Sequence, residues 1–252
     1  MKKYSILMYN FNNYEIFREP LEIDEECEYI YVTDNSNLKS NIWKIIVDKD
    51  LEGLSTFDKC YRVRFNLFKY ATTDICIYID GSMQINKSLR PIYETFINSN
   101  SELGLVIHDK NNVFDEYQIW MNTRNYPKTQ YDKCMLMFSK ANYDPKYKGL
   151  YAGGLRIVKK NENNKNLDEM VFNTLVKLGN ENKIERLDQT IYSFVLNRFF
   201  ENEIKILPIH TSIYKSKFLT WKCHGTNTTH PCNLNFDYIG WLFNKKVNMI
   251  KF

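Results

Sequence analysis

The stretch that most constrains the fold of this chain is Ile75–Ile79, which reads ICIYI. Its residues are apolar or aromatic, and most of them favour β-structure. A short apolar run between polar signals is typical of a strand buried on both faces of a parallel sheet. Asp80 and Gly81 follow at once, and a glycine there lets the backbone turn or approach a ligand closely. The run therefore predicts a central strand of an α/β sheet.

The carboxylate of Asp80 at the end of this strand has two interpretations. Ligands bind at the carboxyl ends of the strands in open α/β sheets. A carboxylate with a nearby hydroxyl, such as that of Ser82, suits Mg²⁺ or Mn²⁺ carrying a diphosphate. Alternatively, Asp80 caps the next turn through a hydrogen bond, as aspartates before glycine often do. The stretch alone leaves both interpretations open.

Other apolar runs predict five further strands, at Tyr4–Tyr9, Glu28–Thr33, Asn41–Val47, Leu103–Ile107 and Ile204–Leu207. Helical spacing predicts helices from Ser55 to about Tyr70, at Pro91–Ile97, Val113–Met121 and Leu167–Leu178, and from Asp188 onward. The segments Asn122–Lys148 and Lys160–Lys165 are predicted to be loops. Strands that alternate with helices in this way predict an α/β fold with helices flanking the sheet.

Three local patterns refine this prediction. Gly153 and Gly154 are expected immediately before a strand, where glycines let a ligand lie against the backbone. Gly179 is expected to end the preceding helix. The helix that Asp188 begins is expected to bury a stripe formed by Ile191, Phe194, Val195 and Phe199.

Polar or aromatic residues end several of the predicted strands. Tyr9 and Asn10 close the first strand, Asp34 follows the second, and His108 and Asp109 follow Leu103–Ile107. In a nucleotide-binding sheet, base and ribose contacts collect at these ends. The alternative is that the polar residues are ordinary turn formers, and for any one of them this explanation is sufficient.

Length and composition limit the class of protein. The chain of 252 residues is long enough for one large domain over residues 1–252. A formal net charge of +4 permits an anionic substrate but gives no strong nucleic-acid footprint. No apolar run approaches the length of a transmembrane helix.

The six cysteines are scattered without a CxxC pair, which favours reduced thiols and a cytoplasmic protein. Cys223, His224, His230 and Cys232 form one irregularly spaced cluster that could bind zinc. The C-terminal segment interleaves basic and aromatic residues, which favours peripheral contact with an anionic membrane or a helix packed on the core. Its residues are Trp241, Phe243, Lys245, Lys246 and Lys251.

The order of these motifs resembles metal-dependent glycosyltransferases of the GT-A fold. The outline is similar to the family-8 retaining enzymes. The resemblance implies a GT-A-like fold with a Rossmann-like nucleotide-binding mixed sheet. It also implies a nucleotide-binding half at residues 1–100, a donor-sugar and acceptor half at 101–209, and a tail over the cleft at 210–252. The closer resemblance is to a plant and bacterial family of glycosyltransferases that was formerly a domain of unknown function. It spans roughly Tyr4 to Phe200, and the segments that carry it are Asn13-Tyr14, Arg18-Glu19-Pro20, Tyr29–Asp34, Tyr78–Ile85 and His108.

The resemblance implies a role for several residues. Asp80 matches the first carboxylate of the Asp-x-Asp motif that holds Mn²⁺ or Mg²⁺, and Ser82 replaces the last one. The hydroxyl is a weaker ligand for a hard cation than a carboxylate. His224, chosen over His210 and His230, would be the histidine ligand.

On the donor side, Arg64 matches an arginine one helix before that motif. Gly153-Gly154 looks like the segment along the donor sugar. Asp188 and Gln189 look like the Asp-Gln pair at the sugar and its anomeric carbon.

The resemblance implies transfer of a sugar from a nucleotide-sugar to a glycan or lipid-linked acceptor, with retention of configuration. We expect a role in bacterial surface polysaccharide synthesis, such as capsule, at the cytoplasmic face of the membrane. An inverting enzyme would need a base on the acceptor side, where Asp109, Asp115 and Glu116 are candidates. A nucleotidyltransferase and a non-catalytic sugar-nucleotide or glycan-binding module remain as alternatives.

Overall fold

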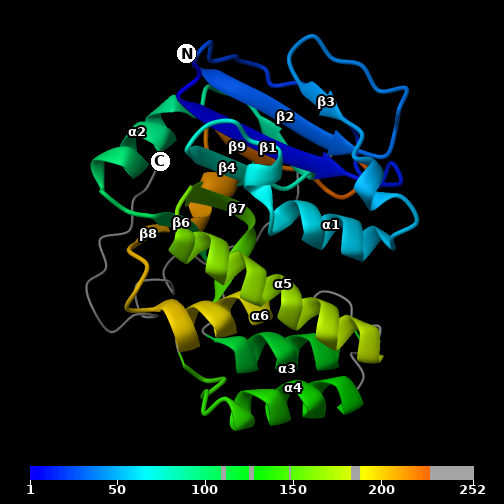
Figure 1. The fold of residues 1–252 in the computed structure, drawn as a ribbon, viewed down its shortest axis with the longest axis vertical. Coiled ribbons are helices and arrows are strands. Elements are labelled where there is room, and N and C mark those ends of the chain that lie inside the picture. Colours follow the sequence, from blue (N-terminus) through cyan, green and yellow to red (C-terminus); the bar gives the residue numbers. More distant parts are fainter. Residues whose placement is uncertain (109–111, 125–127, 148, 183–187, 228–252) are drawn as a thin grey trace.

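The computed structural model describes residues 1–108, 112–124, 128–147, 149–182 and 188–227 (Figure 1). Its strands are β1 (Tyr4–Asn10), β2 (Cys27–Thr33), β3 (Lys44–Ile46), β4 (Ile75–Ile79), β5 (Met83–Ile85), β6 (Leu103–Ile107), β7 (Tyr151–Lys159), β8 (Ile206–Ile209) and β9 (Leu219–Trp221). Its α-helices are α1 (Thr56–Arg64), α2 (Arg90–Asn98), α3 (Val113–Arg124), α4 (Lys128–Lys140), α5 (Glu162–Asn182) and α6 (Asp188–Val195). Within the described ranges, none of the helices has the length and apolar character needed to cross a bilayer.

Seven strands form one mixed sheet in the order β3-β2-β1-β4-β7-β6-β8. Strand β7 is antiparallel to its neighbours β4 and β6, and the other paired strands are parallel. β5 and β9 form a separate two-stranded sheet. The predicted α/β fold with a mixed, helix-flanked sheet is confirmed. Strands from residues 1–100 and from residues 101–209 share this sheet, so both predicted halves belong to one core.

Strand β4 lies inside the sheet because both of its faces are apolar. Ile77 and Ile79 pack in one cluster with Phe96 of α2. Cys76 and Tyr78 face a second cluster, which includes residues of α1 and α3–α6. Figure 1 shows α3–α6 gathered on one side of the molecule and α2 at its opposite margin. A five-residue run of this kind can only be buried between two layers, as the sequence predicted.

The strand order reverses between β1 and β4, which makes this a topological switch point of the sheet. β2 and β3 lie on one side of β1, and β4 lies on the other. Crevices at such reversals, outside the carboxyl ends of the strands, are where open α/β sheets bind ligands. Asn10 ends β1 and Asp80 follows β4, so the fold brings two predicted site residues to this crevice.

Two loop predictions were wrong. Part of Asn122–Lys148 forms α4, in which Cys134 and Phe138 are fully buried. Their i, i+4 spacing is a helical signal that the neighbouring prolines obscured. Part of Lys160–Lys165 belongs to α5, because the Asn161 side chain accepts a hydrogen bond from the Asn164 N–H at 2.8 Å, which starts the helix earlier. That helix also continues through Gly179 rather than ending there.

Three element ends also differ from prediction. The first helix ends at Arg64, well before Tyr70, and β7 begins at Tyr151, so the glycine pair lies inside the strand. The chain from Leu196 to Phe200 is a π-helical turn. Because such a turn takes an extra residue, it shifts the buried stripe by one position. Phe200 is therefore buried, whereas Phe199, predicted to be internal, is 42% exposed.

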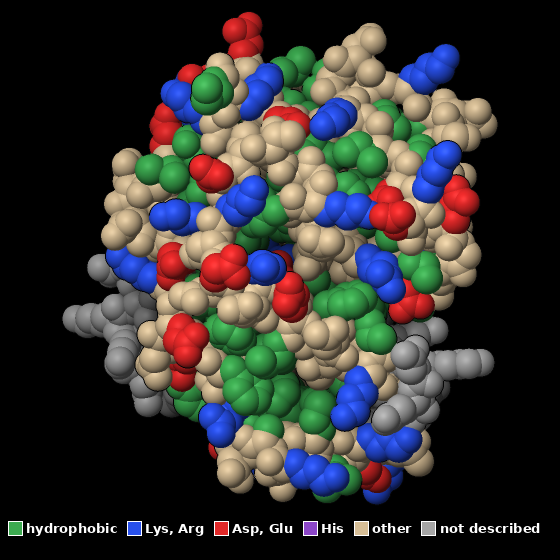
Figure 2. Space-filling view, viewed as in Figure 1, with side chains coloured by type: hydrophobic (Ala, Val, Ile, Leu, Met, Phe, Trp, Pro, Cys, Tyr) green, Lys and Arg blue, Asp and Glu red, His purple; other side chains and the backbone are tan. Residues whose placement is uncertain are grey.

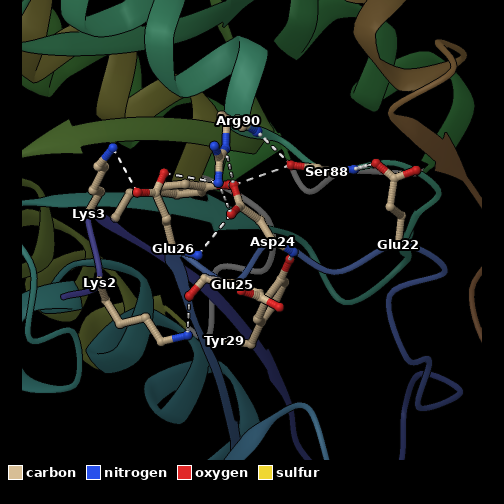
Figure 3. A network of polar contacts seen from close by, with 10 residues as sticks. Lys2, Lys3, Glu22, Asp24, Glu25, Glu26, Tyr29, Ser88 and Arg90 are labelled. Atoms are coloured by element: carbon tan, nitrogen blue, oxygen red, sulfur yellow. Dashed lines mark hydrogen bonds and ion pairs between the residues drawn. The ribbon is translucent and has the colours of Figure 1, made fainter.

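A polar network closes the edge of the sheet where β1 and β2 begin, at the strand ends opposite the crevice (Figure 3). The buried Asp24 carboxylate accepts hydrogen bonds from Arg90 at 2.5 and 2.9 Å and from the Tyr4 hydroxyl at 2.9 Å. It also accepts from the Glu26 N–H at 2.9 Å. The Arg90 hydrogen bonds, with smaller contributions from these partners, hold the pKa of Asp24 well below its usual value against the effect of burial.

We expect Asp24→Ala to lower the free energy of unfolding by about 3 kcal/mol, because it leaves the Tyr4 hydroxyl and the Glu26 N–H without their acceptor. Since the folded pKa is depressed, the ionised carboxylate stabilises the fold above the unfolded pKa of about 3.9 and loses this effect as pH falls. Urea unfolding near neutrality and near pH ~3 should show the difference from wild type shrinking in acid. Glu25→Ala, an exposed neighbour, is the control, and an equal loss there would contradict the assignment.

Candidate functional site

Arg64 is the centre of the polar groups at the crevice. It is the last residue of α1 and is buried. Its Nε and Nη2 atoms donate to the Tyr78 hydroxyl at 3.1 and 2.8 Å, and Nη2 lies 3.5 Å from Oδ1 of Asp80. Its Nη1 atom forms an ion pair with Asp188, the first residue of α6. One guanidinium therefore joins two carboxylates that are 108 residues apart in the sequence.

The charge of Arg64 is retained despite its burial. Burial alone would lower its pKa, but Tyr78, Tyr9 and Asp80 raise it well above the ordinary value. The Arg64 guanidinium also lies over the rings of Tyr78 and Tyr9, at 5.1 and 5.9 Å from their centroids. The site is thus a fixed positive charge between two carboxylates, bordered by aromatic rings.

A second buried arginine supports Arg64. Arg156, on β7, donates to the main-chain carbonyl of Arg64 and to Oδ1 of Asp168 at 2.8 Å. Its guanidinium lies 4.9 Å from the ring centroid of Tyr192 and 5.1 Å from that of Phe65. A cation at the last carbonyl of α1 stabilises that helix end. Sequence reasoning missed Arg156, although an arginine within an otherwise apolar strand is a signal of a buried partner.

The glycine pair lies beside this cluster at an irregularity in β7. Ala152 pairs with Val106 and Arg156 with Leu105, so three residues of β7 bulge between neighbouring pairs. A Cβ atom added to Gly153 would lie 3.4 Å from Nη1 of Arg64 and 3.3 Å from Cγ of Gln189. The missing side chain therefore allows β7 to pass close to Arg64 and Gln189.

At the same edge, the aromatic and amide residues at the end of β1, and Asp34 after β2, have specific partners. Tyr9 stacks on Tyr78 with ring centroids 5.6 Å apart. The Asn10 side chain donates to the Glu15 carbonyl at 2.7 Å and accepts from the Glu15 N–H at 2.9 Å, which closes the loop after β1. Asp34 accepts from the Asn12 N–H and pairs with Lys59, both at 2.9 Å.

The C-terminal part of the described chain returns to this edge. Trp221 of β9 pairs with Met83 of β5, and the Lys222 N–H donates to the Ser82 carbonyl at 2.9 Å. Further along, Nδ1 of His224 lies 2.5 Å from Oε1 of Glu15. Both the β5–β9 pairing and the position of Glu15 were absent from the prediction, because they depend on contacts across about 140 and 210 residues, respectively.

Three of these residues supply atoms suited to a divalent cation. Asp80 offers a carboxylate and His224 an imidazole, and the Ser82 hydroxyl is buried without a hydrogen-bond partner. Glu15 on Nδ1 of His224 corresponds to the carboxylate that commonly orients a metal-binding histidine. Among the residues that the structure describes, however, no three His, Cys, Asp or Glu side chains gather closely enough to form a metal site by themselves.

The other histidine candidates are differently placed. His210 accepts from the Ser212 N–H at 3.0 Å and caps a short helix, Thr211–Tyr214. His230 and Cys232 of the zinc hypothesis lie outside the described residues. The five described cysteines are free thiols.

The residues predicted to lie on an acceptor side have fewer side-chain contacts that point to a site. The His108 N–H donates to the Leu150 carbonyl at 3.0 Å, which continues the pairing of β6 with β7, and Asp109 lies outside the described residues. Asp115 and Glu116 are in the first turn of α3, and Glu116 is buried with one carboxylate oxygen lacking a partner. The basic C-terminal segment, Trp241–Lys251, also lies outside the described residues.

Sequence comparisons give no family for this chain. No known protein-family model matches it. A search among curated proteins found no similar sequence either.

Proposed function

We propose that the protein is a metal-dependent glycosyltransferase of the GT-A type that uses a nucleotide-sugar donor. The observation that carries the proposal is the Arg64 guanidinium, which links Asp80 and Asp188 at the crevice where the sheet reverses its order. Asp80 follows β4, where it would face the donor diphosphate. Asp188 and Gln189 begin α6 beside Gly153, at the position expected for the donor sugar.

Asp80, Ser82 and His224 would hold Mn²⁺ or Mg²⁺, with Glu15 orienting the imidazole. When bound, such a cation neutralises the charge of a leaving nucleoside diphosphate. Two observations support this assignment: the buried Ser82 hydroxyl has no hydrogen-bond partner, and Glu15 pairs with His224. Tyr9, whose ring stacks on that of Tyr78, and Asp34 would contact the nucleotide.

Asp188 would stabilise the positive charge that develops on the sugar ring as the bond to the diphosphate breaks. The ion pair with Arg64 fixes the direction of this carboxylate. Gln189 lies next to it, and its side-chain oxygen is buried without a hydrogen-bond partner. The resemblance of Asp188-Gln189 to the Asp-Gln pair of the family-8 retaining enzymes favours a retaining reaction. A glycan or lipid-linked acceptor of bacterial surface polysaccharide synthesis would enter from the His108 side.

The proposal is tested with the full chain and a panel of sugar nucleotides, with Mn²⁺, with Mg²⁺ and with EDTA. We expect metal-dependent release of the nucleoside diphosphate from one donor, slow with water and faster with an acceptor. Calorimetry with nucleoside diphosphates runs in parallel. Binding without turnover on any donor would indicate a sugar-nucleotide binding module, and release of pyrophosphate would indicate a nucleotidyltransferase.

We expect Glu15→Gln to weaken Mn²⁺ binding about 10–100-fold, because the imidazole of His224 loses the carboxylate that orients it. Calorimetric titration with Mn²⁺ in the presence of a nucleoside diphosphate measures this change. Glu22→Gln, at the opposite edge of the sheet, removes an acidic side chain that pairs with Lys87 and is the matched control. Unchanged Mn²⁺ affinity in Glu15→Gln would remove His224 from the metal site.

A further inference from the structure

A second surface feature lies away from the crevice, between α4, α5 and the π-helical turn. It is a groove of about 1050 Å³. One wall is formed by four residues on one face of α4, Lys133, Leu136, Met137 and Lys140, which are spaced at i, i+3, i+4 and i+7. The other wall is formed by residues of α5 with the same kind of spacing. Leu136 and Met170 lie on these walls, and Phe194, Phe199 and Phe200 complete the lining.

The groove exposes apolar side chains that a folded domain normally buries. Leu136 is 55% exposed, Phe199 is 42% exposed and Met170 is 38% exposed. Scattered exposed hydrophobic residues need no explanation, but a contiguous group in one groove marks an interaction surface. Figure 2 shows hydrophobic side chains gathered over the helical half of the molecule, with Lys and Arg side chains around them.

The charges around the groove favour an anionic partner. Lys133, Lys140 and Lys177 belong to its described lining, whereas Glu169 is the acidic residue there. Lys140 and Lys177 form no ion pair with any residue that the structure describes. Protein surfaces that bind in the interface of an anionic bilayer typically combine lysines with exposed Leu, Met and Phe side chains.

We propose that this groove docks the protein on an anionic phospholipid membrane. Leu136, Met170 and Phe199 enter the boundary between headgroups and acyl chains, and the lysines contact lipid phosphates. The proposal does not rest on the proposed reaction, although a protein held there would meet a lipid-linked acceptor. Other occupants fit the charge less well. The C-terminal segment from residue 228 has three lysines, Lys245, Lys246 and Lys251, and one acidic residue, Asp237, so it would bring positive charge to the groove lysines. A second copy of the groove would do the same, because it carries the same lysines.

The experiment is sedimentation of the full chain with vesicles of phosphatidylcholine, with and without phosphatidylglycerol. We expect binding only to the anionic vesicles. Lys140→Ser with Lys177→Ser should weaken this binding about thirtyfold, the scale expected when two cations leave an anionic surface. Leu136→Ser with Phe199→Ser should weaken it at least about tenfold, because apolar area inserted into the interface is lost.

Matched controls have similar exposure at other sites. Lys39→Ser with Lys49→Ser removes two exposed lysines, and Phe57→Ser with Ile97→Ser removes two apolar side chains that are 44% and 46% exposed. Both control variants should bind as wild type does. Circular dichroism and melting of every variant distinguish lost docking from lost folding.

Four results would overturn the proposal. The first is that both groove variants bind as wild type does, and the second is that the wild-type protein does not bind the anionic vesicles. The third is loss of binding in Lys245→Ser with Lys246→Ser alone, which would place the docking in the C-terminal segment. The fourth is a dimer in light scattering that Leu136→Ser with Phe199→Ser dissociates, which would make the groove an interface between copies.

Discussion

Turnover is expected to fall about 10²–10³-fold when Asp188 is replaced by Asn, the scale seen when one electrostatic contact to a transition state is removed. The amide keeps the size of the side chain and its ability to begin α6, but it removes the negative charge beside the donor sugar. Binding of the nucleoside diphosphate, measured by calorimetry, should stay nearly unchanged, because Asp188 acts on the sugar. Asp80→Asn should instead weaken metal-dependent nucleoside diphosphate binding together with turnover.

The alternative role of Asp188 is that of a helix cap. Asn is itself a good cap, so Asp188→Asn would then change neither the rate nor the stability of the capped helix end. Asp58→Asn is the matched control, since Asp58 lies in the first turn of α1 and accepts from Ser55 at 2.7 Å. Wild-type turnover in Asp188→Asn would remove this residue from the site, and with it the main support for a retaining reaction.

Sequence reasoning placed a residue correctly where the local sequence pattern was compatible with only one secondary structure. The apolar run Ile75–Ile79 could only be an interior strand, so Asp80 had to emerge at the edge of the sheet. A strand that ends in a carboxylate and a helix that begins with Asp188 are both local signals. What the sequence did not contain is their distance in space, which depends on how α1 and α6 pack in one apolar cluster on the same face of the sheet.

The residues that were missed act through contacts across long stretches of chain. Arg156 meets the Arg64 carbonyl across 92 residues, and Glu15 meets His224 across 209. Neither residue belongs to a motif, and each was an ordinary charged side chain until the fold supplied its partner. The exposure of Phe199 has a similar cause, because a π-helical turn follows from packing at the end of α6 and not from the apolar period.

Replacement of Arg64 by Met is expected to have the broadest effect. It leaves the Asp80 and Asp188 carboxylates close to each other with no cation between them, in a partly buried site. Removing one partner of a buried ion pair costs about 3–5 kcal/mol, so the melting temperature should fall clearly. Turnover should fall more than about 10²-fold, because Asp188 loses the group that fixes its direction.

Arg64→Lys separates charge from geometry. The ammonium restores a positive charge, but it lacks the planar fork that lets one side chain donate to Tyr78 while contacting Asp80 and Asp188. We therefore expect Arg64→Lys to recover most of the stability lost in Arg64→Met and little of the turnover. Unfolding in urea and steady-state rates on the same preparations provide the two readouts. If lysine restored both, Arg64 would act as a point charge, and the fixed separation of Asp80 from Asp188 would not matter for the reaction. If methionine lost stability but kept its rate, the arginine would be a structural brace, and the crevice would have to bind its donor without it.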